Sequence, residues 1–168
     1  MRPARGDDAA RLAEIHVAAW RAACQDIVPS EQLARVSVAA RTRDWTRWLA
    51  LPGSSTFVCQ IHGRPAGFAT VSPLRANGRP SRSLLELRRL YVDPEHWRRS
   101  VGRELVERVF SVARERGFTQ VVLWVLTRNR RARAFYTARG GIPDRTRQMT
   151  IGGHPVDEIR YCIPERSW

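Results

Sequence analysis

Lysine is absent from this sequence of 168 residues, so all 29 positions counted as Lys or Arg are arginine. With 16 acidic residues, the formal net charge is +13 at pH 7. Lysine and arginine keep a protein surface equally soluble, so the exclusive use of arginine indicates genome composition rather than a function. The charge favours an anionic partner, either a phosphorylated cofactor or nucleic acid. Because the arginines are spread over nearly every segment, an arginine-rich nucleic-acid-binding module is the disfavoured alternative.

Long apolar runs and paired cysteines are also missing. The longest apolar run in the second half, residues 121–126, is far too short to span a bilayer, and residues 1–8 lack the apolar core of a signal peptide. We therefore expect a cytoplasmic protein with no membrane partner. Cys24, Cys59 and Cys162 are odd in number and widely spaced, which predicts reduced, mostly buried thiols and no metal site.

Apolar residues are sufficient for one folded domain. Hydrophobic residues make up 43% of the chain, and six of them are tryptophan, which argues against disorder. No repeat, low-complexity tract or linker divides the sequence. A chain of this length fits one sizeable core, so we expect a single domain over residues 1–168.

The first half predicts two helices and three strands. One helix, capped by Asp7, runs to about Ala23, and a second opens at Pro29, with a break near residues 37–42. An antiparallel meander follows, with strands expected over residues 56–61, 66–71 and 83–92. The polar stretch 73–82, with Asn77 and Gly78 at its tip, is predicted to be a loop.

The second half predicts a crossover and a closing hairpin. A helix from Val101 to Gly117 precedes the continuously apolar strand 121–126, which is typical of a strand covered on both faces. Strands 83–92 and 121–126 should be parallel because a helical crossover joins them. A further helix is expected over residues 129–139, and a hairpin over 147–151 and 156–163. The fold class is therefore α/β with a mixed sheet.

A phosphate-binding pattern follows the third strand. Leu90 to Pro94 runs into Trp97 and a basic turn that ends at Gly102 and Arg103, where a helix starts. Free N–H groups and the helix dipole both favour an anion at such a place. Tyr136, on the following helix, offers a phenolic proton. A phosphate-bearing cofactor beside a proton donor indicates group transfer.

Ordered matches over nearly the whole chain resemble the GCN5-related N-acetyltransferases (GNAT), which move an acetyl group from acetyl-coenzyme A to an amine. The matches are Leu90-Tyr91-Val92-Asp93-Pro94, the basic glycine turn, Asn129, Phe135-Tyr136, the first helix from His16 to Arg21, Gly152 to Val156, and Arg160-Tyr161. This resemblance implies a mixed, mostly antiparallel sheet with a parallel central strand pair flanked by helices.

One departure concerns the pyrophosphate loop. In the family it usually reads Gln/Arg-x-x-Gly-x-Gly/Ala, and the corresponding places here are Trp97, Ser100 and Gly102. Ser100 replaces a glycine that lets the loop approach phosphate closely, which favours weaker cofactor binding. Its hydroxyl can instead cap the helix or donate to phosphate.

The resemblance also implies a set of contacts to acetyl-coenzyme A as co-substrate. Backbone N–H groups of the turn would hold the pyrophosphate, and main-chain groups of Leu90 and Val92 would bind the pantetheine arm. The implied cofactor-binding residues are Leu90, Tyr91, Val92, Arg98, Arg99, Ser100, Val101, Gly102, Arg103, Asn129 and Phe135. The alternative for the three arginines is a solvated basic face. Asn129 is expected to cap its helix, bind the cofactor arm, or do both.

Two catalytic roles are expected. Tyr136 matches the family's general acid for the departing thiolate, and its alternative is packing beside Phe135. A lysine-like amine costs about 4–5 kcal/mol to deprotonate at pH 7, so a base or a water relay is useful. Glu86 is the candidate base, with a surface carboxylate paired to Arg88 or Arg89 as an equal alternative.

The acceptor is expected to be a small-molecule or peptide amine whose identity no motif reveals. His16 and Trp20 could line its pocket or could simply pack against the first helix. A homodimer is compatible with such folds, although no residue pattern specifies one. The alternative function from another class is a coenzyme A-binding sensor without turnover, which Ser100 supports and Tyr136 opposes.

Overall fold

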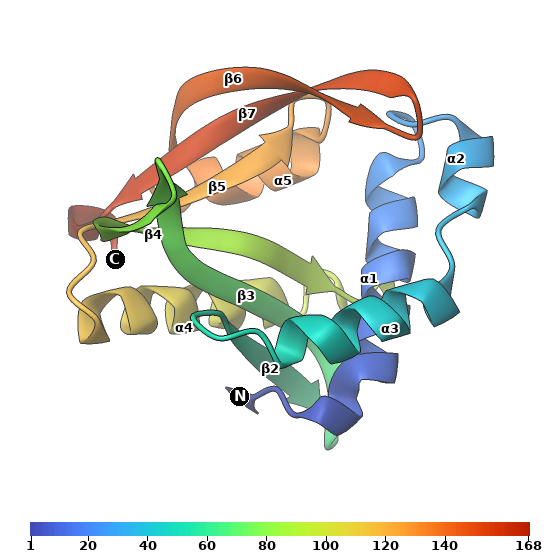
Figure 1. The fold of residues 1–168 in the computed structure, drawn as a ribbon, viewed down its shortest axis with the longest axis horizontal. Helices are drawn as coiled ribbons and strands as arrows, with labels where there is room; N and C mark the ends of the chain where they lie inside the picture. Colours follow the sequence, from blue (N-terminus) through green and yellow to red (C-terminus); the bar gives the residue numbers. More distant parts are fainter.

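The computed structural model describes residues 1–168 apart from the side chain of Ala76. Seven strands form one sheet in the order β1-β2-β3-β4-β5-β7-β6 (Figure 1). The strands are β1 (Arg2–Pro3), β2 (Ser55–Ile61), β3 (Arg64–Ala76), β4 (Arg79–Val92), β5 (Gln120–Leu126), β6 (Ile142–Ile151) and β7 (His154–Pro164). Each neighbouring pair is antiparallel except β4 and β5, which are parallel. The predicted mixed α/β class with a parallel central pair is confirmed.

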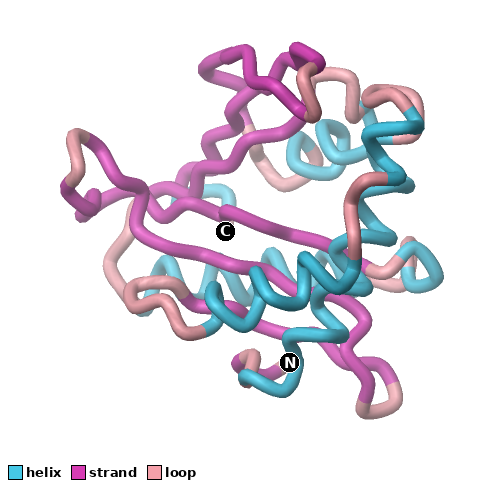
Figure 2. Tube along the Cα trace, turned by 45° about the vertical axis from the view of Figure 1, so that its right-hand side comes forward, coloured by secondary structure: helices cyan, strands magenta, loops and turns pink.

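Helices cover both faces of this sheet (Figure 2). They are α1 (Ala9–Cys24), α2 (Ser30–Ala34), α3 (Val38–Leu49), α4 (Val101–Glu115) and α5 (Arg130–Thr137). The second predicted helix is broken, as expected, but the break lies at residues 35–37 and residues 38–42 are helical. Ser37 caps α3 by accepting a hydrogen bond from the N–H of Ala40. In the part of the chain that the structure describes, no helix is long and apolar enough to cross a membrane.

Alternation along β2 explains why helices lie on both faces. Phe57 packs in the core under α4, with Val101 and Leu105, whereas its neighbour Val58 packs with Leu12 of α1 on the opposite side. Successive side chains of a strand point to opposite faces, so both faces of β2 and β3 need apolar cover. Apolar side chains of α1 and α3 provide that cover on one face, and those of α4 provide it on the other.

The prediction of a loop over residues 73–82 is wrong. β3 continues to Ala76 and β4 starts at Arg79, so only Asn77 and Gly78 form the turn. Both have positive φ, 50° and 76°, as a two-residue hairpin turn with the twist of its strands requires. Polarity misled the prediction because this end of the hairpin projects beyond the core, where strands need no apolar face.

One further strand boundary differs from the sequence-based expectation, and one strand was not expected at all. β6 begins at Ile142, not at residue 147, and the short edge strand β1 was not expected. Seven consecutive residues of β6, starting at Ile142, are exposed, so this edge strand carries no apolar alternation that a sequence pattern could reveal. Its hydrogen bonds to β7 hold it in the sheet.

β4 and β5 pair over only three positions. Leu84, Leu85 and Glu86 lie opposite residues 120–122, and the parallel pairing then ends. Just beyond, Arg88 is an extra residue in β4, because Thr70 pairs with Arg89 while Val71 pairs with Leu87. Such a β-bulge bends a strand and increases its twist. β4 therefore diverges from β5 toward its C-terminal end, as its ribbon does in Figure 1.

We expect Gly67→Ala to destabilise the fold and displace α4. A Cβ at Gly67 would lie 2.9 Å from Val101 Cγ1 and 3.0 Å from the Tyr91 carbonyl oxygen. Overpacking of this kind costs about 1–3 kcal/mol in the free energy of unfolding, measurable by denaturant titration. Gly6→Ala is the matched control, since nothing lies within 4 Å of that Cβ position. Equal stability of the two variants would show that α4 can shift freely on the sheet.

Candidate active site

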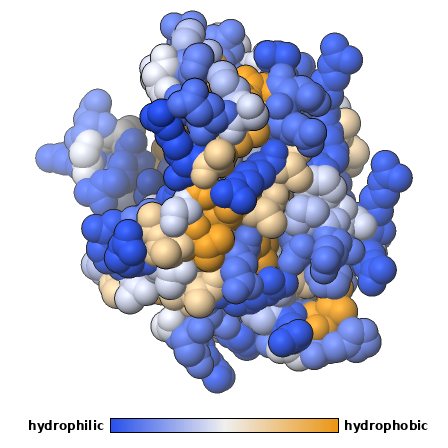
Figure 3. All heavy atoms as spheres, turned by 90° about the vertical axis from the view of Figure 1, so that its right-hand side faces the viewer, coloured by the Kyte–Doolittle hydropathy of each residue, from blue (hydrophilic) through white to orange (hydrophobic). Residues whose placement is uncertain are grey.

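A cavity of about 730 Å³ lies where β4 leaves β5. Its walls come from α1, the C-terminal end of β4, the turn before α4, and α5. The predicted site residues that line it are Leu90, Tyr91, Val92, Arg98, Ser100, Gly102, Arg103, Asn129, Phe135 and Tyr136. The face of the molecule that carries α1 and α2 shows hydrophobic side chains at its centre, bordered by hydrophilic ones (Figure 3).

Two residues of the turn before α4 have left-handed backbone conformations. Arg98 has φ 62° and Ser100 has φ 63°, values that favour glycine. Ser100 is the N-cap of α4, and its side chain makes no capping hydrogen bond within the described structure. The first intrahelical bond runs from the Glu104 N–H to the Ser100 carbonyl. The N–H groups of residues 101–103 therefore remain available at the positive end of the helix.

Gly102, in the first turn of α4, faces the Phe135 ring of α5. A Cβ at this position would lie 3.4 Å from two carbons of the Phe135 ring and 3.7 Å from Val92 Cγ2. These are ordinary or slightly tight contacts, so only a small residue fits without moving the ring. Gly102 thereby keeps the backbone of the first turn of α4 exposed to the cavity that it lines.

The alternating hydrogen-bond pattern of β4 shows which of its main-chain groups face the gap between β4 and β5. The N–H of Asp93 donates to the carbonyl of Ala66 on β3, at 2.9 Å. In an antiparallel pair, every second residue bonds to the same neighbour, so Leu90 and Val92 direct their main-chain groups away from β3. The Val92 carbonyl accepts a hydrogen bond from the indole N–H of Trp97, at 2.8 Å. This bond fixes the turn against the diverging strand.

Four arginines, Arg98, Arg103, Arg131 and Arg139, line the cavity. The guanidinium carbon of Arg131 lies 3.2 Å from the centre of the Trp97 ring, and that of Arg139 lies 3.8 Å from the centre of the Phe135 ring. Burial lowers the pKa of Arg131, and the charge of Arg98 adds to that effect. Together they make the cavity positively charged, which favours an anionic ligand. Arg131 and Arg139 were missed in the sequence because arginine is so frequent that no single one stands out.

Tyr136 reaches the cavity from α5 and is 7% exposed. Burial raises the pKa of its phenol above the usual value, so the group stays protonated at neutral pH. Phe135 packs edge-on against it at 5.1 Å between ring centroids. Asn129 caps α5, as expected, because its side chain accepts from the N–H of Ala132 at 3.1 Å.

Five predicted site residues do not line the cavity. Arg99 is exposed in the turn, and Val101 is buried under the sheet with its side chain in the core. Glu86 lies on β4 opposite Val122, with its Oε2 4.0 Å from Arg88 Nε. The remaining two are His16 and Trp20, both on α1.

His16 lies behind the cavity wall. Its ring stacks on Tyr91 with 4.3 Å between centroids. Burial lowers the pKa of His16 to about 3, with contributions from the positive charges of Arg41 and Arg89. The imidazole is therefore neutral at physiological pH. Trp20 instead packs against the cluster that contains Cys24 and Val28.

A mixed sheet with a splayed parallel pair, a basic helix N-terminus and a buried tyrosine thus border one cavity, an arrangement that suits acetyl-group transfer. A family profile described as the acetyltransferase (GNAT) family matches residues 11–141. The chain belongs to the GNAT family.

Two curated relatives are similar to this chain. An uncharacterized N-acetyltransferase of Methanocaldococcus jannaschii is 29% identical over 105 residues, which cover 60% of this chain and 46% of that protein. An uncharacterized N-acetyltransferase of Bacillus subtilis is 28% identical over 170 residues, which cover 99% of this chain and 94% of the relative. The match thus spans less than half of the archaeal relative and nearly all of the bacterial one.

Solved structures share the fold. A GCN5-related N-acetyltransferase from Rhodopseudomonas palustris has a TM-score of 0.78 and 25% identity, covering 97% of this chain and 93% of that one. The PaiA N-acetyltransferase from Thermoplasma acidophilum, crystallised in complex with coenzyme A, has a TM-score of 0.74 and 18% identity, covering 97% and 96%.

We expect Ser100→Gly to stabilise the protein without weakening acetyl-coenzyme A binding. An L-residue pays about 1–2 kcal/mol in the left-handed region, and glycine relieves that cost. The free energy of unfolding should therefore rise by about 1 kcal/mol, and calorimetry should show an equal or slightly tighter dissociation constant. A loss of more than about tenfold in affinity, 1.4 kcal/mol, would mean that the hydroxyl contacts the cofactor directly.

Proposed function

We propose that this protein transfers the acetyl group of acetyl-coenzyme A to a primary amine by direct attack, with Tyr136 as general acid. The observation that carries the proposal is the single cavity that joins the β4 edge, the basic N-terminus of α4 and the Tyr136 phenol. The complex of the structurally similar PaiA enzyme with coenzyme A supports the same occupant here.

Residues of the turn and of α4 bind the phosphates in this proposal. The free N–H groups of residues 101–103 donate to the pyrophosphate, and Arg98 and Arg103 add positive charge. Arg131 and Arg139 increase the positive potential of the same cavity. Arg99 and Val101 contribute through the backbone of the turn, since their side chains do not line the cavity.

Main-chain groups of Leu90 and Val92 bind the pantetheine arm as an added strand would. A backbone N–H at this edge also stabilises the oxyanion of the tetrahedral intermediate. The amine nitrogen attacks the thioester carbonyl carbon, a C–N bond forms, and the C–S bond breaks. The sulfur leaves as a thiolate that accepts a proton from Tyr136.

The attacking nitrogen must lose a proton to a base. Glu86 remains our candidate base, because it lies on β4, the strand that carries Leu90 and Val92. It lies outside the cavity lining, so in this proposal it acts through water. Water relays allow a base to act without direct contact. His16 acts indirectly, since the neutral ring stacked on Tyr91 holds that wall of the cavity in place. The acceptor is a small-molecule or peptide amine.

Gly102→Glu is expected to abolish acetyl-coenzyme A binding while the protein stays folded. The substitution places bulk and negative charge beside the N–H groups that should hold the pyrophosphate. Gly102→Ala is the matched control, because a Cβ meets only contacts of 3.4 Å or more. Calorimetric titration with circular dichroism measures both properties. Unchanged affinity in a folded Gly102→Glu protein would mean that the cofactor binds elsewhere.

Tyr136→Phe should lower kcat by about 10²–10⁴ while the dissociation constant for acetyl-coenzyme A changes less than about threefold. The change removes one hydroxyl and almost no packing volume. Because burial raises the phenol pKa, the wild-type kcat should not fall through Tyr136 ionisation below about pH 10. Thiol release measures turnover.

The packing alternative for Tyr136 gives the opposite pattern. It predicts a lower melting temperature and unchanged turnover per folded molecule in Tyr136→Phe. That result would remove Tyr136 from the mechanism. Binding of acetyl-coenzyme A without thiol release from any amine in the wild type would instead favour the sensor.

A further inference from the structure

Arg89 is a half-buried cation beside the proposed active site. It lies two residues before Tyr91 on β4, so both side chains project from the same face of the sheet. Its guanidinium carbon lies 3.8 Å from the centre of the Trp48 ring and 5.7 Å from that of Trp45, both on α3. The aromatic rings hold the guanidinium in place and exclude water from one of its faces.

Within the described residues, no hydrogen bond or ion pair joins Arg89 to a carboxylate. Its charged neighbours are Arg88 and Arg41, which repel it, and Glu86. Glu86 lies 4.0 Å from Arg88, and the Asp44 carboxylate is already paired with Arg41 and Arg47. Taking a cation out of water without a partner is unfavourable. A ligand anion at Arg89 would recover this energy.

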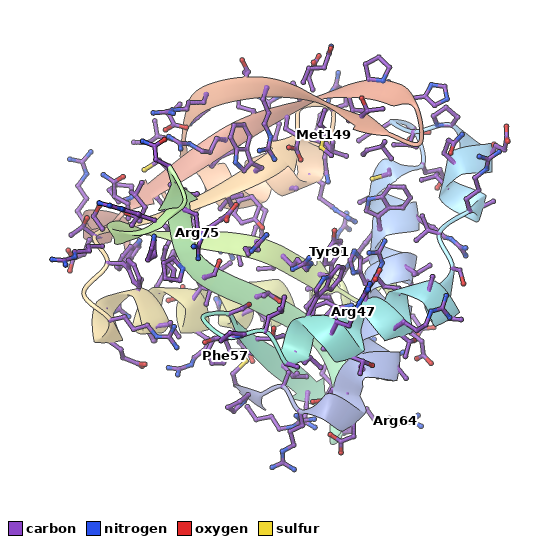
Figure 4. The ribbon with its side chains drawn as sticks, in the orientation of Figure 1. Arg47, Phe57, Arg64, Arg75, Tyr91 and Met149 are labelled. Carbon is purple, nitrogen blue, oxygen red and sulfur yellow. The ribbon has the colours of Figure 1, made fainter. Side chains whose placement is uncertain are left out.

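The distance from Arg89 to the cavity suits one molecule that reaches both. Tyr91 lines the cavity and packs against His16 of α1, and Figure 4 shows it near α1 and α3. Two residues along a strand span about 6.6 Å. An amine placed at the thioester beside Tyr91 could therefore extend a second group to the Arg89 guanidinium.

We propose that the acceptor is a primary amine that also carries a carboxylate, and that Arg89 binds this carboxylate. This inference rests on the proposed acetyl transfer and specifies its substrate class. The planar guanidinium presents two parallel N–H donors that match the two carboxylate oxygens. The guanidinium carbon lies over the Trp48 ring, and within the described residues its N–H groups form no hydrogen bond, so they can donate to such a pair. Arg89 thereby selects the acceptor and orients its amine toward the cavity.

The first test compares amines that differ only in this charge. 4-Aminobutyrate and 4-aminobutanamide form one pair, and β-alanine and its amide form a shorter one. kcat/KM is measured by thiol release from acetyl-coenzyme A and corrected for the fraction of free amine. We expect the carboxylate member of at least one pair to be preferred by about 10- to 100-fold, the scale of hydrogen bonds to charged groups. Equal values in both pairs would overturn the proposal.

The second test uses Arg89→Gln with Arg47→Gln as the matched control. Arg47 lies on α3 (Figure 4), and its loss also removes one positive charge from this region. Arg89→Gln should abolish the preference by raising KM for the carboxylate amine alone. The control should retain the preference, and acetyl-coenzyme A affinity should be unchanged in both variants. Arg89→Lys keeps the charge without the planar fork and should restore part of the preference.

The outcomes separate this inference from the function on which it rests. Acetylation of amines without a carboxylate preference, or an unaltered preference in Arg89→Gln, would overturn the role of Arg89 and leave acetyl transfer intact. A lower melting temperature of Arg89→Gln with the wild-type preference would identify Arg89 as a packing residue on Trp48. Failure of acetyl-coenzyme A to bind the wild-type protein would overturn both proposals.

Discussion

The short parallel pairing of β4 and β5 is the constraint on which the site depends. Three positions, Leu84 to Glu86, pair with β5, and the bulge at Arg88 then turns β4 away. Longer pairing would use the main-chain groups of Leu90 and Val92 in the sheet and close the space between the strands. The same divergence brings the end of β4 to the turn that starts α4, so strand edge and helix N-terminus border one cavity.

The two faces of β4 differ in charge and in the side chains that surround them. On the α4 side, arginines beside Trp97 and Phe135 make the cavity positively charged, which favours an anionic ligand. On the α1 and α3 side, Tyr91 and Arg89 lie among aromatic rings. The gap between β4 and β5 joins these faces, which suits the proposed reaction, in which the thioester lies on one side and the attacking amine comes from the other.

The order of elements could be predicted from the sequence. Hydrophobic periodicity is a local pattern of residues, and the crossover rule needs only the order of strands and helices. The apolar run of β5 and the helical face of α4 were sufficient for the parallel pair. The bulge at Arg88 could not be predicted because no glycine or other turn residue marks it. The exposed strand β6 could not be predicted in full because its sequence shows no apolar alternation. His16 was a candidate for the acceptor pocket with packing as its alternative, and only the structure shows its ring stacked behind Tyr91. Arg131 and Arg139 were hidden among many other arginines.

Hydrogen exchange with and without saturating acetyl-coenzyme A tests the central claim most directly. The account predicts slower exchange for the amides of Leu90 and Val92 and of residues 101–103, because the cofactor accepts hydrogen bonds from them. Amides of the β6–β7 hairpin, away from the cavity lining, should exchange at an unchanged rate. Binding that slows exchange elsewhere but leaves the β4 edge and the start of α4 unprotected would contradict the account.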